Sequence, residues 1–232
     1  MSVLYKFESV SYIAPPKEKG SSPLTILNDA TFTIPSGTFA ILTGPSGSGK
    51  STLLRLFNRL ADAAKGSIYF NGRKIEVYPV LELRRRIGWV PQVPVRFPGS
   101  VIENLRLPFT LSKDRLFSES EISSRIDELK GMGLLPEELF SREAEDLSVG
   151  EAQRLNLLRA LALKPDVLLL DEPTSALDNV AAEKLLDHII GIQREKGLNA
   201  ILVSHRQEEV SRIGGMIIDV RDGVAKNREA VN

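Results

Sequence analysis

The sequence of 232 residues contains no cysteine and only two histidines. Without cysteine there is no disulfide framework and no thiolate chemistry, which fits a reducing compartment. Lysine plus arginine and aspartate plus glutamate each number 30, so the formal net charge is zero. Sequence-independent nucleic-acid binding needs a basic surface, so we expect no nucleic acid as a partner.

The sequence also lacks a long apolar run. No stretch approaches the roughly 18 residues that a membrane-spanning helix needs. Residues Met1–Lys6 alternate like a strand and do not form the apolar core of a signal peptide. We therefore expect a soluble protein, and if it works at a membrane, another chain must do the spanning. The length suffices for one α/β domain with a sizeable core.

One stretch of the sequence, GPSGSGKST, matches the phosphate-binding pattern G-x-x-x-x-G-K-[ST]. A short apolar run precedes it at Phe39–Thr43, and apolar residues with helical spacing follow it, so the loop joins a strand to a helix. Its glycines let the backbone fold around an anion, Lys50 supplies a charge for the outer phosphates, and the Ser51 hydroxyl can ligate Mg²⁺. The residues expected to contact the nucleotide here are Gly44, Pro45, Ser46, Gly47, Ser48, Gly49, Lys50, Ser51 and Thr52.

The order of strand and helix patterns predicts an α/β fold. Early alternating segments predict an antiparallel β part, with a hairpin at Asn71-Gly72 flanked by strands 67–70 and 73–77. Strand signals fade between about residues 93 and 147, where helical ones dominate and Ser118 with Glu121 predicts a capping box. Later strands and helices alternate, which indicates a parallel sheet covered by helices on both faces. We expect a single domain with a catalytic core at 1–92 and 148–232 and a helical subdomain at about 93–147.

Two adjacent acids, Asp171 and Glu172, follow the buried-looking strand Val167–Leu170. Ligands of parallel sheets gather at the carboxyl ends of strands. Because neighbouring residues on a strand point to opposite sides, the two acids can have different roles. Asp171 would hold the Mg²⁺ shell, and Glu172 would orient and deprotonate an attacking water. The alternative is two solvated acids at a strand end.

A second anion site is indicated where Ser148 would cap a helix expected over 151–163. Gly150 allows a ligand to approach the backbone closely. The alternative interpretation is an ordinary capped helix, which would not need such an approach. One nucleotide needs only one such site. The second would therefore serve the nucleotide of a partner molecule, which predicts a dimer with ATP sandwiched between its chains.

Taken together, these motifs resemble those of the ATP-binding cassette (ABC) ATPases, and nearly the whole chain is covered in the family's order. The matching segments are the phosphate loop Gly44–Thr52, the Q-loop glutamine Gln92, the signature Leu147–Arg154, the acidic strand Val167–Pro173, the D-loop Ser175–Asp178 and the switch segment Ser204–Arg206. The resemblance implies a P-loop NTPase fold and ATP with Mg²⁺ as cofactors.

The resemblance implies roles for four further residues. Tyr12 would stack on adenine, Gln92 would touch the metal or the water, and Asp178 would reach across the dimer. His205 would contact the γ-phosphate. Without the resemblance, Tyr12 could instead pack on its own sheet, and His205 could be an ordinary surface residue.

The signature departs from the family's usual Leu-Ser-Gly-Gly-Gln. Val149 replaces a glycine, so this backbone must avoid positive φ. Glu151 replaces a neutral amide, and its carboxylate would repel a γ-phosphate unless it points away or meets a cation. We keep Ser148, Gly150 and Glu151 as expected phosphate contacts, with slower turnover or weaker dimerisation as a possible consequence.

Within the family, the chain looks like the nucleotide-binding ATPase subunit of a membrane transporter. The expected partners are transmembrane permease subunits and a second copy across two ATP, at the cytoplasmic face of the cell membrane. A groove near Gln92 and the segment Val93–Asn104 would grip the permease. The region Leu81–Leu107 looks like metal-export or phosphate-import ATPases, while the direction of transport stays open. The alternatives are a soluble ABC ATPase in DNA repair or translation, and a P-loop kinase.

Overall fold

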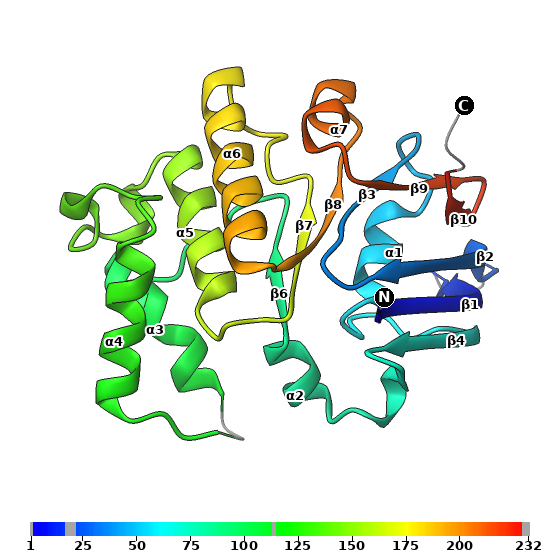
Figure 1. The fold of residues 1–232 in the computed structure, drawn as a ribbon, viewed down its shortest axis with the longest axis horizontal. Coiled ribbons are helices and arrows are strands. Elements are labelled where there is room, and N and C mark those ends of the chain that lie inside the picture. The colour runs from blue at the N-terminus through cyan, green and yellow to red at the C-terminus, as the bar shows by residue number, and fades with distance from the viewer. Residues whose placement is uncertain (1, 17–21, 113–114, 229–232) are drawn as a thin grey trace. The chain divides into compact units, whose positions relative to one another are not determined.

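The computed structural model describes residues 2–16, 22–112 and 115–228. It divides into two compact units, one of Met1–Val80 with Asn199–Asn232 and one of Leu81–Leu198. The expected division into a catalytic core and a helical subdomain at 93–147 stays a prediction. Figure 1 shows the helices and strands of both units.

The first unit is built on a mixed sheet in the order β5-β4-β1-β2-β10-β9-β3-β8. Its antiparallel part, expected from the sequence, consists of β1 (Val3–Ala14), β2 (Leu24–Pro35), β4 (Lys65–Phe70) and β5 (Arg73–Lys74). In its parallel part, β3 (Phe39–Thr43) pairs with both β8 (Asn199–Val203) and β9 (Met216–Arg221), while β10 (Val224–Asn227) joins β9 to β2. The helices of this unit are α1 (Lys50–Leu56), α7 (Gln207–Ile213) and the 3₁₀ turn η1 (Ile75–Val77).

Aromatic side chains form much of the core under the antiparallel part. Tyr5 contacts Phe57 and Phe70 with ring centroids 4.7 and 4.8 Å apart, and Phe7 stacks on Phe32 at 4.5 Å. The hydroxyl of Tyr5, whose side chain is fully buried, donates to the Phe57 carbonyl at 3.0 Å. Such pairs add about 0.5–1.5 kcal/mol beyond the area they bury. This cluster packs the segment after α1 against the strands.

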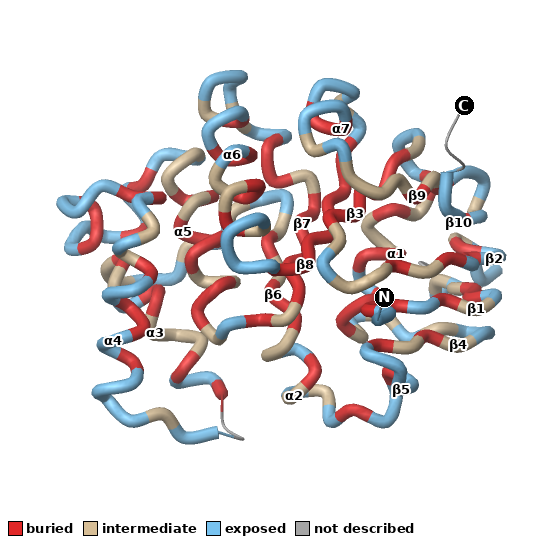
Figure 2. The backbone as a smooth tube through the Cα atoms, in the orientation of Figure 1, coloured by how far each residue is buried: buried red, intermediate tan, exposed pale blue. Residues whose placement is uncertain are grey.

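The second unit has two parallel strands, β6 (Ile87–Val90) and β7 (Val167–Asp171), in a register that pairs Val90 with Leu170. Every residue of β7 is buried, as its apolar sequence predicts (Figure 2). The helices of this unit are α2 (Val80–Arg85), α3 (Val101–Leu111), α4 (Glu119–Lys130), α5 (Val149–Leu161), α6 (Asn179–Lys196) and the 3₁₀ turns η2 (Glu137–Leu139) and η3 (Ala144–Asp146).

The ends of several elements follow from local chemistry. The expected capping box of Ser118 and Glu121 is present, and α6 ends at Gly197 with φ 60° as expected. Two expectations were wrong in detail. The hairpin after Asn71 has only a two-residue second strand, because η1 turns the chain away. Helix α5 begins and ends two residues earlier than expected, because Ser148 caps it at Val149.

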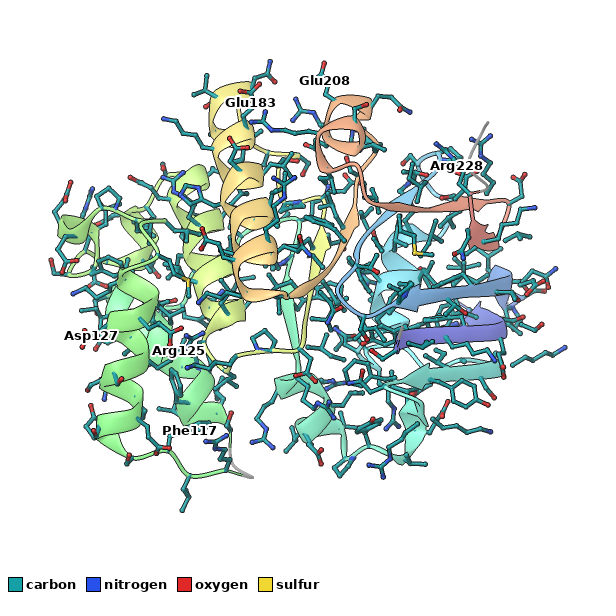
Figure 3. The ribbon with its side chains drawn as sticks, in the orientation of Figure 1. Phe117, Arg125, Asp127, Glu183, Glu208 and Arg228 are labelled. Carbon is teal, nitrogen blue, oxygen red and sulfur yellow. The ribbon has the colours of Figure 1, made fainter. Side chains whose placement is uncertain are left out.

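Glu128 connects three elements of the second unit. Its carboxylate lies 2.5 Å from Arg125, 3.1 Å from Lys164 and 3.2 Å from Lys196. Arg125, labelled on α4 in Figure 3, also donates to the carbonyls at the end of α5, 2.6 Å from Leu161 and 3.0 Å from Ala162. The hydrogen bond from Arg125, assisted by the two lysines, lowers the pKa of Glu128 to about 2.

Replacing Glu128 with glutamine should therefore destabilise the protein in a pH-dependent way. A carboxyl with a pKa of about 2 when folded and 4.5 when unfolded contributes stability above pH 4.5, and that stability is lost as pH falls toward 2. Because Glu128 is partly exposed, we expect a loss of only about 1 kcal/mol at pH 7, or about 2–4 °C in melting temperature. Thermal melts of Glu128→Gln and the parent from pH 7 to 2 measure this.

Asp127→Asn is the matched control, because Asp127 lies exposed on the same helix. It should melt like the parent at every pH. A Glu128→Gln deficit that stays constant from pH 7 to 2 would show that the ion cluster is not its source.

Candidate functional site

The phosphate-binding loop follows β3, which lies between β8 and β9. Three loop glycines have positive φ, 142° at Gly44, 79° at Gly47 and 101° at Gly49. Only glycine fits at Gly44, because a Cβ there would lie 2.0 Å from the carbonyl oxygen of Val220 on β9. The loop therefore needs glycine both for its conformation and for its close packing on the sheet.

The loop offers the chemistry that a triphosphate needs. The buried Lys50 ammonium donates to the carbonyls of Gly44 at 3.0 Å and Pro45 at 2.7 Å, both neutral, so its charge stays available to an anion. The buried Ser48 hydroxyl has no hydrogen-bond partner among the described residues. A Cβ on Gly47 would meet nothing within 4 Å. A buried hydroxyl without a partner, a free positive charge and open space together fit the phosphates of ATP.

The switch histidine lies beside the start of this loop. A cavity of about 450 Å³ is lined by Gly44, Pro45, Ser204, His205 and Asp219, among others. His205 is exposed, so its ring is accessible from solvent. His205 follows Lys50 of the phosphate loop by 155 residues in the sequence. The structure nevertheless places His205 in the lining of the same cavity as Gly44 and Pro45, the first residues of the loop.

Sequence reasoning missed the residue that anchors the switch segment. The Ser204 hydroxyl donates to the buried Glu209 carboxylate at 2.5 Å and accepts from the Arg206 backbone N–H at 3.1 Å. Glu209 also lies 3.6 Å from the Arg206 guanidinium. A Ser-x-x-x-x-Glu spacing is too common to be recognised from one sequence.

Tyr12 lies on β1 and pairs with a residue of β2 that packs on the loop. In the register of β1 and β2 it pairs with Leu27, whose side chain lies 3.1 Å from where a Cβ on Gly49 would be. Tyr12 is half-buried. Its side chain is therefore partly accessible, and its strand partner packs on the loop. Ser46 is exposed, and Thr52 lies in the first turn of α1.

In the second unit, the strand register brings Gln92 and Glu172 together. Val90 pairs with Leu170, and Gln92 and Glu172 each lie two positions beyond these paired residues. The Gln92 amide donates to the Glu172 carboxylate at 3.4 Å. A glutamine and a carboxylate at hydrogen-bond distance can hold one water between a donor and a base.

The two acids differ for a reason that the sequence did not show. Asp171 is the last residue of β7 and is 6% exposed. Glu172 lies beyond the strand with φ 45°, a left-handed conformation that costs a non-glycine residue about 1–2 kcal/mol. The expectation that both acids lie on the strand was wrong, because the chain turns at Glu172. Such strain at a candidate catalytic residue is typical of functional sites.

The signature residues form a capping box at the start of α5. The Glu151 carboxylate accepts from the backbone N–H and the hydroxyl of Ser148, at 2.8 and 2.7 Å, and the Ser148 hydroxyl accepts from the Glu151 N–H. These bonds lower the pKa of Glu151. Val149 is the first helical residue and is exposed, so a glycine is not required there. The Glu151 carboxylate, which replaces the family's amide, is thus bound at the N-terminus of α5.

The D-loop aspartate lies close to the signature. Asp178 caps α6 by accepting from the Ala181 N–H at 2.9 Å. A Cβ on Gly150 would be 3.8 Å from Leu177 and 3.9 Å from Ala181, which is ordinary contact. Among the residues that the structure describes, no contact therefore requires glycine at position 150. His188, whose Nδ1 lies 2.7 Å from the Lys184 carbonyl on its own helix, carries no sign of function.

The described residues contain no group of three or more His, Cys, Asp or Glu side chains that could hold a metal ion. A Mg²⁺ ion here would need phosphate oxygens to complete its coordination. The sequence predicts that Ser51 in the first unit, and Gln92 and Asp171 in the second, supply oxygens to Mg²⁺, and this stays a prediction. Hydroxyl, amide and carboxylate oxygens suit this hard cation.

Three comparisons with known proteins bear on the site. The family model described as ABC transporter matches residues 27–175. The chain is 38% identical over 198 residues to ABC transporter I family member 17 of Arabidopsis thaliana, covering 85% of this chain and 73% of that protein. It is 40% identical over 193 residues to the glycine betaine uptake system ATP-binding protein YehX of Escherichia coli strain K12, covering 83% and 62%.

A solved structure matches over the whole chain. It is a dimeric structure of a post-hydrolysis state of the ATP-binding cassette MJ0796 bound to ADP and Pi, with a TM-score of 0.84, 29% identity, and coverage of 99% of this chain and 100% of that one. Within the described parts of our chain, no helix is long and apolar enough to cross a bilayer.

The loop geometry predicts different outcomes for alanine at two glycines. Gly44→Ala should destabilise the protein severely, because its Cβ would collide with the Val220 carbonyl. Gly47→Ala has room and should cost about 1–2 kcal/mol for its positive φ, while weakening nucleotide binding in the loop. Thermal melting and titration with a fluorescent ATP analogue measure both effects. Equal losses of stability in the two variants would contradict the described packing at Gly44.

Proposed function

Because this chain belongs to the ABC transporter family and carries that family's ATPase cassette, we propose that it powers a membrane transporter by binding and hydrolysing ATP. The observation that carries the proposal is the phosphate loop, which combines the Lys50 charge, a buried Ser48 hydroxyl without a partner among the described residues, and open space at Gly47. The Gln92–Glu172 pair supplies a second, catalytic element. The dimeric cassette MJ0796, whose structure is a post-hydrolysis state bound to ADP and Pi, matches 99% of this chain, which supports ATP binding and hydrolysis here.

We assign the catalytic roles as follows. Lys50 binds the outer phosphates. Ser51, Gln92 and Asp171 would each supply an oxygen to Mg²⁺, which would neutralise phosphate charge when bound. Glu172 takes the proton of the attacking water, which the Gln92 amide helps to orient. His205 contacts the γ-phosphate and fixes the geometry of attack, and Tyr12 stacks on the adenine.

The second anion site supports a homodimer across two ATP. Ser148 is exposed, and no contact within the described part of the chain requires glycine at position 150. A γ-phosphate from a second chain would find the Ser148 hydroxyl and the first amides of α5, with Asp178 nearby. Because the Glu151 carboxylate is bound by Ser148, the phosphate and this carboxylate would compete for one hydroxyl. This competition is a physical reason for weaker dimerisation than with glutamine at position 151.

We propose transmembrane permease subunits as the partners and the cytoplasmic face of the cell membrane as the location. The segment after Gln92 exposes three apolar side chains, Val93, Val95 and Phe97, at 72%, 42% and 41% of their surface. These suit a protein partner better than water. The relative YehX is named for glycine betaine uptake, which favours import over the metal export considered from the sequence.

Replacing Glu172 with glutamine tests the assignment of the base. Loss of a general base lowers turnover by about 10²–10⁴-fold, while the phosphate loop and nucleotide binding remain intact. Steady-state phosphate release and ATP-analogue titration measure the two effects. Glu183→Gln, at an exposed carboxylate on α6, is the matched control and should keep full turnover (Figure 3). Undiminished hydrolysis in Glu172→Gln would remove this residue from the role.

Replacing Gly150 with alanine tests the shared site. In the Glu172→Gln background with ATP and Mg²⁺, sedimentation should show a dimer that Gly150→Ala weakens at least tenfold, because the added methyl blocks approach of the partner's phosphate. Its melting temperature should not fall, since Cβ contacts within the chain are ordinary. Gly191→Ala, at a helical position with open space around it, is the control and should leave the dimer intact. A dimer unaffected by Gly150→Ala would contradict this placement of the interface.

A further inference from the structure

The segment that follows Gln92 is held by two buried asparagines, and this feature has no counterpart in the sequence predictions. The backbone N–H of Val95 donates to Asn156 Oδ1 at 3.2 Å, and Asn156 Nδ2 donates back to the Val95 carbonyl at 3.0 Å. Asn104 binds Phe97 in the same way, accepting from its N–H at 3.1 Å and donating to its carbonyl at 2.8 Å. Asn104 is 0% and Asn156 2% exposed.

Each asparagine side chain thus forms with one residue the two hydrogen bonds that a neighbouring strand would form. An amide presents one donor and one acceptor side by side, which matches the N–H and C=O of a single extended residue. The two asparagines come from different helices, Asn104 from α3 and Asn156 from α5, so the segment is bound between them. Buried amides are costly unless satisfied, and here both are satisfied by this segment.

An arginine joins the two asparagines. The Arg159 guanidinium donates to Asn104 Oδ1 at 3.1 Å, Asn156 Oδ1 at 2.7 Å and the Val95 carbonyl at 2.9 Å. It also lies 4.7 Å from the centre of the Phe97 ring. Burial lowers the pKa of Arg159 to about 10, so it keeps its charge at neutral pH.

The same segment is tied to the signature helix at two further points. Gln153 on α5 donates to the Pro91 carbonyl, directly before Gln92, at 2.9 Å. Arg96 donates to the carbonyl of Leu147, directly before Ser148, at 3.0 Å. The apolar side chains of Val93, Val95 and Phe97 stay exposed, so burial of those side chains does not fix the segment. The hydrogen bonds to its backbone fix the segment instead.

We propose that Asn104 and Asn156 are positioning residues for ATP hydrolysis: they hold the backbone after Gln92 in one conformation and thereby keep the Gln92 amide at Glu172. Neither asparagine is among the residues that we assign to the nucleotide, so both act through Gln92. The inference rests on the proposed role of Gln92 in hydrolysis.

Three variants test this proposal. Asn156→Asp keeps the size and the acceptor of asparagine but cannot donate to the Val95 carbonyl. Asn156→Leu and Asn104→Leu each lose both hydrogen bonds to the segment. We expect kcat for ATP hydrolysis to fall about tenfold with KM for ATP changed less than twofold. Trypsin cleavage after Arg96 should accelerate at least tenfold in the folded protein, because the segment is released. Asn199→Leu removes a buried asparagine that accepts from the Gly37 N–H in the first unit, and it should change neither readout.

A double-variant cycle separates positioning from a general structural loss. Gln92→Ala combined with Asn156→Asp should be no slower than Gln92→Ala alone, because the asparagine acts through the glutamine. Additive losses would overturn the proposal, as would an unchanged kcat in variants whose Arg96 site has become cleavable. Unchanged cleavage at Arg96 would show that the segment is held in another way, which also overturns it. Full hydrolysis by Gln92→Ala would instead refute the catalytic role given to Gln92 above, a separate outcome.

Discussion

The close packing of the turn after β3 on strand β9 is the constraint on which the first unit's site depends. At Gly44 there is no room for a side chain, because the Val220 carbonyl occupies the space that a Cβ would need. The turn is thereby fixed to the sheet, and the Lys50 ammonium spans it by binding two of its carbonyls. Because the loop is rigid before its ligand binds, binding does not have to order it, and the entropy cost of binding is lower.

The second unit uses a different constraint, the in-register pairing of two parallel strands. Because Val90 pairs with Leu170, residues two positions further along each strand come together, and the Gln92 amide meets the Glu172 carboxylate. The geometry of the pair depends on what the chain does after each strand. Glu172 turns into the left-handed region, whereas the segment after Gln92 is held by asparagine amides. Different interactions thus determine the backbone conformation after the end of β6 and after the end of β7.

Polar side chains at helix starts explain how this chain tolerates an unusual signature. Glu151 completes a capping box with Ser148, the same arrangement that begins α3 and α4. A carboxylate at the start of a helix is favourable, since it satisfies free N–H groups and meets the positive end of the helix dipole. The substitution therefore stabilises the helix while it adds a competitor for an incoming phosphate.

The sequence by itself determined the motifs whose parts lie within a few residues of each other: the phosphate loop, the Ser118 capping box, the asparagine–glycine hairpin and the acidic strand. It also indicated the fold class, because hydrophobic periodicity is a local property. The bonds of Asn156 to Val95, 61 residues away, the anchoring of Arg96 to Leu147 and the left-handed turn at Glu172 were decided only by the tertiary structure. Such contacts depend on which distant backbone groups packing leaves without a partner, and no local pattern of residues encodes that.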